Sequence, residues 1–511
     1  MTMINNYRYI LQHRAETHPE RVALIYKEEQ INYAQLNVYA IEAANWLAQN
    51  GIMKGDRIAF LDFNNKNYVH LINGCLISGV VPVSINWRST SEDINFILKD
   101  AGCKLILYGV SFTNLIGPAI SDITIESNTI DDISNNIFKE NSSVKLSLPF
   151  VDEEDLALLI YTSGTTGRPK GVRISYNNIF QMYLSLRNET PLFGPASVNL
   201  VAGPWYAIVG IGYFVFGIYT GCTNVLLQYF DPIETCALIE KYKITNAFLA
   251  PVMMQVICGL DEIEEYDLSS LQNIQYGGSP IHAEQLLLCY KTFNCYFTQG
   301  YGLTETSGIA TVLRFDDHEK ILLNDDPEHK KLLRSAGKPY PGVEIKIINE
   351  IGENSTFGNI GEVCLKGKVI AQGYWKATGE NEKIFQEDGW LLTGDMGYID
   401  EQGYLFLVDR KNDLIISKGI NIYPAEIELV LNQHPKIKEC AVIGVPHELY
   451  GENICVVAVI ENSDLQLPEL RTWAKDKLAE YKLPARLEII KELPRNPTGK
   501  ILRKDLRVLF N

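Results

Sequence analysis

The chain has 511 residues, of which 46% are hydrophobic and 21% charged, and its formal net charge is −16. A chain of this length exceeds what one hydrophobic core supports, so we expect at least two domains of an ordinary globular protein. The acidic balance argues against a nucleic-acid partner, because binding to phosphates needs a basic surface.

Cysteine usage and hydropathy bear on the compartment. The ten cysteines are scattered, without a CxxC pair or a metal-ligand spacing, which is typical of reduced thiols in a cytoplasmic protein. The start, "MTMINNYRYILQHRAETHPE", has no apolar stretch of signal-peptide type. Residues 198–227 carry no charge and are long enough to cross a bilayer, but glycines and Pro204 interrupt them and basic flanks are absent. We therefore predict a buried helix and strand, which could also line a pocket for an apolar ligand.

Helix and strand patterns alternate from the start of the chain to about residue 330. Residues 16–64 indicate a strand, a helix that stops at Gly51, and a buried strand "RIAFL". The segments "EDINFILKDAGCKLILYG" and "IEKYKITNAFLAP" repeat the order of helix and apolar strand. This alternation predicts an α/β fold whose parallel-type sheets are covered on both faces.

The pattern changes twice in the last third of the chain. Short alternating strands between glycine turns, such as "GVEIKIINE" and "GYLFLVDR", predict a small β-rich subdomain at about 337–410. After residue 410 come a helix at 423–435, strands at 439–446 and 454–460, and a helix at 467–484. Residues 411–511 hold 15 Lys/Arg and 14 Asp/Glu, so a near-neutral segment follows an acidic body. We expect a large domain over 1–410 and a small α+β domain over 411–511.

The segment "YTSGTTGRPKG" at 161–171 is the strongest local signal. Its glycines let backbone N–H groups converge on one point, which makes an anion-binding nest. Hydroxyl donors and Lys170 add to this, so we predict a phosphate-binding loop between the strands "DLALLIY" and "GVRIS". The spacing is not that of the G-x-x-x-x-G-K-[ST] nucleotide loop. The alternative is a plain glycine-rich hairpin.

Further motifs follow this loop in a fixed order. They are "YGGSP" at 276–280, "QGYGLTET" at 299–306, "LLTGDMGYID" at 391–400, "LVDRKNDLIISKGINIYPAEIE" at 407–428 and "PRNPTGK" at 494–500. The series resembles that of the adenylate-forming enzymes, which include acyl-CoA synthetases, aryl-CoA ligases, firefly luciferase and peptide-synthetase adenylation domains. The resemblance covers nearly the whole chain. It implies a large AMP-binding body with a small, mobile C-terminal lid.

The resemblance also implies an ATP site and a metal site. It assigns ATP or AMP contacts to residues within the motifs: Thr162, Ser163, Gly164, Thr165, Thr166, Gly167, Lys170, Gly278, Ser279, Tyr301, Gly302, Thr304, Asp395, Arg410 and Lys500. Glu305 and Thr162 would hold Mg²⁺, which bridges phosphate oxygens. Thr304 would donate to the α-phosphate, and Asp395 would accept from the ribose hydroxyls. Thr304, Glu305 and Lys500 are the expected catalytic residues.

The implied lid brings two different segments to the site in turn. Lys500 suits a point charge at a developing oxyanion in the first half-reaction. After rotation of the lid, Gly419 would let the pantetheine of CoA approach, and Lys418 and Lys482 are candidates for its phosphates. Asn412 falls at the position of the hinge, but its residue type does not identify a hinge.

The implied acyl pocket departs from the family pattern. We assign to it Trp205, Tyr206, Ala207, Gly210, Gly277 and Gly300. Many acyl- and aryl-CoA members carry an aromatic–His pair at the pocket entrance, and Ala207 stands where that histidine would fall. The segment "PWYAIVG" also lacks the aspartate with which amino-acid-activating relatives hold the amine. We expect an apolar pocket in which each glycine leaves volume.

These observations predict an acid–thiol ligase of the acyl-CoA synthetase type. ATP would activate a carboxylic acid, fatty or otherwise apolar, to acyl-AMP with release of pyrophosphate, and CoA would then take the acyl group. The alternatives are a ligase that loads an external acyl carrier protein, an aryl-CoA ligase, a luciferase-like oxidase and a catalytically inactive paralogue. Expected cofactors are ATP, Mg²⁺ and CoA. Neither nucleic acid nor a transmembrane segment is expected, and a homo-oligomer is left open.

Overall fold

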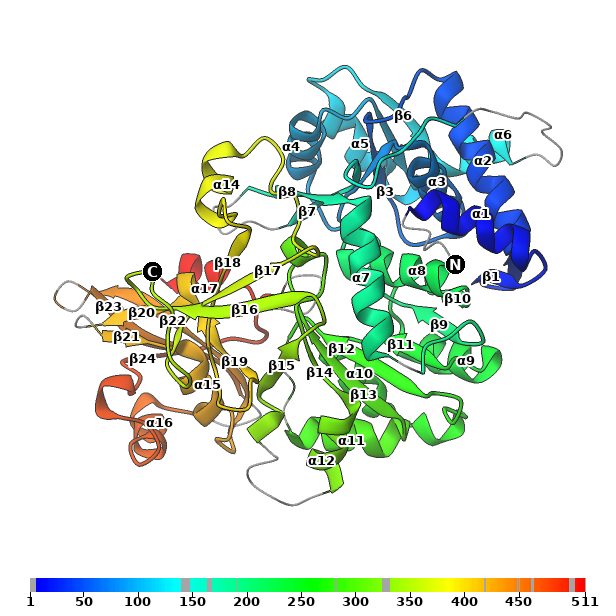
Figure 1. The fold of residues 1–511 in the computed structure, drawn as a ribbon. Helices are drawn as coiled ribbons and strands as arrows, with labels where there is room; N and C mark the ends of the chain where they lie inside the picture. The colour runs from blue at the N-terminus through cyan, green and yellow to red at the C-terminus, as the bar shows by residue number, and fades with distance from the viewer. Residues whose placement is uncertain are drawn as a thin grey trace. The chain divides into compact units, whose positions relative to one another are not determined.

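The structure is a computed structural model, and it divides into two compact units (Figure 1). The larger unit is Met1–Glu344 with Leu365–Leu391, and the smaller unit is Ile345–Cys364 with Leu392–Asn511. The residues that the structure describes are 6–138, 148–162, 168–190, 192–279, 281, 283–323, 331–417, 420–447, 449, 451–460, 464–495 and 501–510.

A parallel sheet in the larger unit has the strand order β4-β3-β5-β6. Its strands are β3 (Arg57–Leu61), β4 (Val81–Ser84), β5 (Leu105–Tyr108) and β6 (Glu126–Thr129). The helices between and after them are α3 (Lys66–Ser78), α4 (Ser91–Ala101), α5 (Thr113–Ile120) and α6 (Ile130–Ile137). Apolar side chains of α4 and α5 pack with those of the strands in one core, as expected for a parallel sheet covered by helices.

Local sequence explains where such a helix begins and ends. Helix α4 starts after Thr90, whose hydroxyl accepts from the Asp93 amide while the Asp93 carboxylate accepts from the Thr90 amide. It ends at Gly102, whose φ of 63° is a left-handed conformation that suits glycine. The predicted succession of helix and buried strand over residues 92–109 is therefore correct.

A second sheet of the larger unit runs in the order β15-β14-β13-β12-β11-β9-β10-β1-β2. Its strands are β1 (Val22–Tyr26), β2 (Glu29–Asn32), β9 (Val198–Val201), β10 (Thr223–Leu226), β11 (Asn246–Phe248), β12 (Asn273–Gly277), β13 (Tyr296–Tyr301), β14 (Thr311–Leu313) and β15 (Ser335–Pro339). Neighbours from β1 to β13 pair in parallel, whereas β2, β14 and β15 pair antiparallel. The other helices of this unit are α1 (Tyr7–Thr17), α2 (Tyr33–Gln49), α7 (Tyr176–Glu189), α8 (Ile208–Thr220), α9 (Pro232–Tyr242), α10 (Pro251–Cys258), α11 (Ala283–Phe293), α12 (Phe315–Leu323) and α14 (Thr378–Ile384).

A two-stranded hairpin carries the predicted phosphate-binding loop. Strands β7 (Leu156–Thr162) and β8 (Lys170–Ser175) are antiparallel, and Thr162 lies opposite Lys170. Residues 365–391 return to this hairpin, because the Trp375 amide donates to the Gly171 carbonyl at 2.7 Å and the Arg173 amide donates to the Gly373 carbonyl at 2.9 Å. A segment far along the chain is thus hydrogen-bonded to the strand that leaves the loop.

The smaller unit contains most of β16, β17 and β18, all of β19, and a separate sheet ordered β21-β20-β23-β22, with β24 paired to β23. The strands are β16 (Val343–Ile348), β17 (Gly361–Gly367), β18 (Trp390–Ile399), β19 (Leu405–Arg410), β20 (Ile415–Ser417), β21 (Ile420–Ile422), β22 (Ile437–His447), β23 (Gly451–Ile460) and β24 (Arg486–Ile489). Its helices are α15 (Pro424–Leu431), α16 (Leu467–Ala474) and α17 (Arg503–Phe510). Alternate residues of β22 enter two different cores, one with α15 and α16 and one with α17.

The predicted α/β class, with a sheet-rich body and a small sheet-and-helix unit, is confirmed. The uncharged segment at 198–227 forms β9, the buried helix α8 and β10, and no described helix is long and apolar enough to cross a membrane. The sequence did not indicate β2 or α14, and the predicted helix at 467–484 ends as an α-helix at Ala474.

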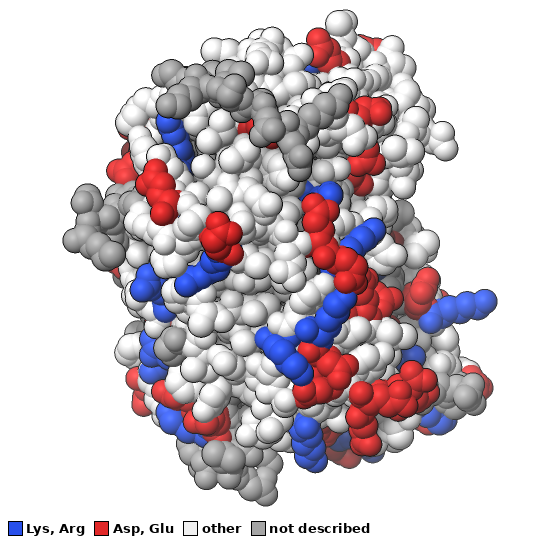
Figure 2. Space-filling model, turned by 90° about the vertical axis from the view of Figure 1, so that its right-hand side faces the viewer, with Lys and Arg blue, Asp and Glu red and all other residues white. Residues whose placement is uncertain are grey.

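Acidic and basic side chains are interspersed over the face drawn in Figure 2.

Candidate active site

The phosphate-loop hairpin places two of the predicted ATP residues opposite each other. Thr162 and Lys170 are cross-strand neighbours at the open end of β7 and β8. The Lys170 ammonium forms an ion pair with Glu380 and lies 5.3 Å from the ring centroid of Tyr374. The side chain of Lys170 is only 14% exposed, so its stem and charge are held by these neighbours. Ser163, Gly164, Thr165, Thr166 and Gly167 lie outside the described residues, and their role stays a prediction.

Glu305 lies in a 3₁₀ turn, Thr304–Thr306, that follows β13. The Tyr374 hydroxyl donates to Glu305 Oε1 at 2.6 Å, and the Ala371 amide donates to the Glu305 carbonyl at 2.8 Å. Both the side chain and the backbone of Glu305 are therefore held by the 365–391 segment. A half-buried carboxylate with one fixed oxygen suits a hard divalent cation, which prefers oxygen ligands.

The two glycine-containing motifs lie side by side at the carboxyl ends of parallel strands. Gly277 ends β12 and pairs in register with Gly300 of β13, and Tyr301 ends that strand. Ligands of open α/β sheets bind outside the carboxyl ends of their strands. Gly278 has a φ of 81°, and no atom lies within 4 Å of where its Cβ would be, so it leaves space beside Ser279.

The glycine volumes expected for an acyl pocket are absent at Gly277 and Gly210. A Cβ on Gly277 would lie 2.3 Å from the Gly300 carbonyl oxygen, and one on Gly210 would lie 2.2 Å from the Pro204 carbonyl oxygen. At both positions the missing side chain permits close approach of two backbones. The same holds for Gly302, where an added Cβ would lie 2.5 Å from the Gly308 carbonyl oxygen. The assignment of Gly210, Gly277 and Gly300 to the acyl pocket stays a prediction.

We expect Gly210→Ala to lower the free energy of unfolding by about 1–3 kcal/mol, because an added methyl group overpacks the contact between α8 and the 203–204 turn. The matched control is Gly212→Ala on the same helix, whose Cβ would meet the end of the flexible Met182 side chain at 3.3 Å. Urea unfolding of both variants measures the difference. Equal stability of the two variants would contradict the close approach at Gly210.

The aromatic residues before α8 differ in environment. Trp205 is 2% exposed and packs against Tyr68 and Phe214, with ring centroids 5.6 and 5.0 Å away. Tyr206 is half-buried and contacts Trp87 edge to face, and Ala207 is the residue before the first turn of α8. Trp205 is thus a core residue in this structure, whereas Tyr206 remains a candidate for a pocket wall.

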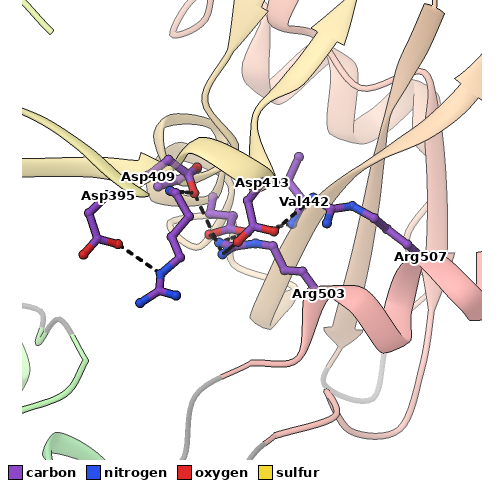
Figure 3. A network of polar contacts seen from close by, with 9 residues as sticks. Asp395, Asp409, Asp413, Val442, Arg503 and Arg507 are labelled. Carbon is purple, nitrogen blue, oxygen red and sulfur yellow. Dashed lines mark hydrogen bonds and ion pairs between the residues drawn. The ribbon is translucent and has the colours of Figure 1, made fainter. Parts of the chain in front are cut away.

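In the smaller unit, Asp395 and Arg410 are cross-strand partners on β18 and β19. Arg410 Nε lies 3.0 Å from Asp395 Oδ1, and the carboxylate side chain is 9% exposed (Figure 3). The Asp395 amide donates to the Thr393 hydroxyl at 3.0 Å, which in turn donates to the Val363 carbonyl at 2.8 Å. The aspartate is therefore oriented by its own strand and by a cation, and it can accept further hydrogen bonds.

The remaining predicted residues lie in the C-terminal part. Lys418, Gly419 and Lys500 are outside the described residues, and Asn412 belongs to the 3₁₀ turn Lys411–Asp413. Lys482 donates to both Glu426 oxygens at 2.6 and 2.7 Å. Burial opposes the charged form of Lys482, but the Glu426 contacts outweigh it and raise the pKa of the ammonium. A CoA phosphate would have to compete with Glu426 for this lysine.

Sequence reasoning missed the residues that hold the predicted ones. Tyr374 contacts Glu305 and Lys170, and Glu380 pairs with Lys170. The signal was present as "GYW" at 373–375, an aromatic pair after a glycine between strand-like segments. This pattern does not indicate which residues Tyr374 contacts, because Glu305 and Lys170 lie about 70 and 200 residues earlier in the chain.

Two family models match the chain. The model of the AMP-binding enzymes matches residues 11–375, and that of the AMP-binding enzyme C-terminal domain matches residues 426–500. The chain belongs to the AMP-binding enzymes. The adenylate-forming resemblance drawn from the motifs is confirmed, and so is the expectation of an AMP-forming acid–thiol ligase.

Similar proteins cover nearly the full chain. A fatty acid–[acyl-carrier-protein] ligase of Streptomyces coeruleorubidus is 33% identical over 100% of this chain and 96% of its own length. A long-chain-fatty-acid–CoA ligase of Mycobacterium tuberculosis is 30% identical over 99% of both chains. The solved O-succinylbenzoate coenzyme A synthetase of Bacillus subtilis, in complex with ATP and magnesium ion, superposes with a TM-score of 0.85 at 30% identity, covering 97% of this chain and 98% of that chain.

Proposed function

We propose that this AMP-binding enzyme activates an apolar carboxylic acid with ATP and transfers the acyl group to the thiol of CoA. The carboxylate oxygen would attack the α-phosphorus and release pyrophosphate, and the thiol would then attack the acyl carbonyl and release AMP. The observation that carries the proposal is the convergence of Lys170 and Glu305 on Tyr374, next to the glycine motifs of β12 and β13. A cation, a carboxylate and space left by glycine suit a metal–polyphosphate ligand.

The residues on the phosphate side fit a magnesium ion. Glu305 would supply a carboxylate oxygen, and Thr162 a hydroxyl, to a metal that neutralises charge on the phosphates. Lys170 would contribute a second positive charge after exchanging Glu380 for phosphate. On the smaller unit, Asp395 would accept from the ribose hydroxyls while Arg410 keeps its carboxylate oriented. Lys500, Thr304 and the remaining loop residues keep the roles that the family resemblance implies.

Support for an apolar acid comes from α8 and from the relatives. Helix α8 has no charged side chain, and nearly all of it is buried. A polar acyl tail placed along it would lose hydration without gaining a partner. Two full-length relatives act on fatty acids by name, and one of them loads an acyl carrier protein. Loading of an external carrier protein is therefore the second candidate function.

The ten cysteines are free thiols, which supports a reducing compartment, and we propose the cytoplasm.

We expect pyrophosphate release to depend on added acid, with kcat/KM rising about fourfold per methylene until the pocket is full, because each buried methylene contributes roughly 0.8 kcal/mol. The measurement compares acetate, hexanoate, dodecanoate and benzoate, with 6-hydroxyhexanoate as the polar match of hexanoate. Thioester formation is then scored with CoA and with a phosphopantetheinylated carrier protein. A preference for acetate or for the hydroxylated acid would rule out the apolar pocket, and transfer to the carrier alone would select the second function.

A further inference from the structure

The 371–381 segment contacts both charged residues of the phosphate site, Lys170 and Glu305. Its backbone pairs with β8 through Gly171 and Arg173, and the Trp375 indole donates to the Asp100 carbonyl at 3.0 Å. The Ala371 amide fixes the backbone of Glu305. The segment therefore links the phosphate-loop hairpin to the turn that carries the metal carboxylate.

Tyr374 lies at the centre of this segment in a fixed position. Its amide donates to Asn381 Oδ1 at 2.7 Å, and Asn381 Nδ2 donates back to its carbonyl at 2.9 Å. Its ring packs edge to face on Phe385, with 5.5 Å between centroids, and the residue is 7% exposed. A buried tyrosine held from both sides presents its hydroxyl and its ring face in constant directions.

Each polar feature of Tyr374 contacts one charge of the site. The hydroxyl donates to Glu305 Oε1 at 2.6 Å. The ring lies 5.3 Å from the Lys170 ammonium, within the range of a cation–π contact. The other partner of Lys170 is Glu380, six residues after Tyr374 and 36% exposed in its side chain.

We propose that Tyr374 is a positioning residue for the metal carboxylate Glu305, and that Glu380 is a competing anion that holds Lys170 until polyphosphate displaces it. This inference rests on the proposed function and assigns to it Tyr374 and Glu380, which were not among the site residues predicted from the sequence. A carboxylate keeps about four lone-pair positions, so accepting one hydroxyl leaves room for a cation. The Glu380 side chain is 36% exposed, so water can hydrate its carboxylate when Lys170 turns to phosphate.

Tyr374→Phe tests the first part, since it removes the hydroxyl and keeps the ring. Partners that orient a metal ligand typically contribute about 10- to 100-fold in metal affinity. We therefore expect Mn²⁺ to bind about 10- to 100-fold more weakly to the variant in the presence of α,β-methylene-ATP, which cannot release pyrophosphate. Electron paramagnetic resonance of free Mn²⁺ measures this affinity without turnover. The affinity for the analogue without metal should be unchanged.

The control for general loss of packing is Tyr176→Phe, which removes another buried hydroxyl, one that donates to the Leu76 carbonyl at 2.7 Å. It should leave Mn²⁺ affinity at the wild-type value while lowering the unfolding midpoint comparably. Equal Mn²⁺ affinity in wild type and Tyr374→Phe overturns the positioning role. Failure of the wild type to bind Mn²⁺ with the analogue instead overturns the proposed function itself.

Glu380→Gln tests the second part independently. Without its competing anion, Lys170 should be available to phosphate, so α,β-methylene-ATP should bind more tightly than to the wild type in titration calorimetry without metal. Weaker or equal binding would show that Glu380 orients Lys170 or does not compete for it, and would overturn that part.

Discussion

Lys500→Ala is expected to abolish acyl-AMP formation and to spare thioester formation from supplied acyl-AMP. The family resemblance places this lysine at the α-phosphate and carboxylate in the first half-reaction only. Loss of one donor at a developing oxyanion typically costs about two to three orders of magnitude in rate. Lys500→Arg should not restore the rate, because a planar guanidinium does not replace a compact ammonium.

The measurement separates the half-reactions. Pyrophosphate release from ATP and acid reports the first, and acyl-CoA formed from synthetic acyl-AMP reports the second. Lys504→Ala is the matched control, since Lys504 is an exposed cation four residues further on. It should retain both rates. A parallel loss of both half-reactions in Lys500→Ala would assign the lysine to binding or to folding rather than to adenylation.

The sequence predicted the fold class and the family correctly, for a physical reason. Phosphate and metal chemistry need glycines, hydroxyls, a lysine and a carboxylate close together in the chain, and "YTSGTTGRPKG" and "QGYGLTET" supply these locally. Helix caps and αL glycines, such as Thr90 and Gly102 around α4, are also local signals.

What could not be predicted depends on contacts between distant segments. Tyr374 acquires its significance only when residues 365–391 return to the hairpin and to Glu305. What lies next to each glycine likewise depends on the tertiary structure. Gly278 faces open space while the neighbouring Gly277 faces a carbonyl, although both stand in the same motif. Residue type alone therefore does not tell which glycines leave open space and which permit a close approach of two backbones.

Arg503 is the centre of a buried charge network in the smaller unit (Figure 3). Its Nη2 donates to both Glu428 oxygens at 2.9 and 2.8 Å, and its Nη1 lies 3.4 Å from Asp413 and 4.0 Å from Asp409. Arg507 adds a contact of 3.0 Å to Asp413. The network joins α17 to α15 and to the end of β19.

Arg503→Met is expected to destabilise the smaller unit by about 3–5 kcal/mol, because removal of one partner leaves buried carboxylates without their cation. The Asp409 side chain is 2% exposed and that of Glu428 is 13% exposed, so water cannot replace the arginine. Hydrogen exchange of peptides from β22 and α17 measures the loss. Arg486→Met is the control, since Arg486 pairs with Glu488 while 43% exposed and should cost about 0–1 kcal/mol.

The loss of stability that Arg503→Met causes in the smaller unit should become smaller as pH falls. Burial raises the pKa of Glu428 and of Asp409, and Arg503 opposes that rise. A carboxyl with a raised pKa in the folded state takes up a proton on folding, so its burial costs stability as pH rises through the folded pKa. Without Arg503 both folded pKa values rise further, and this cost extends to higher pH. Other titrating groups cancel in the difference between variant and wild type. The hydrogen-exchange protection of the variant should therefore approach that of the wild type as pH falls from about 8 to about 5. A difference in protection that stays constant with pH would show that Arg503 stabilises the unit by packing rather than by charge.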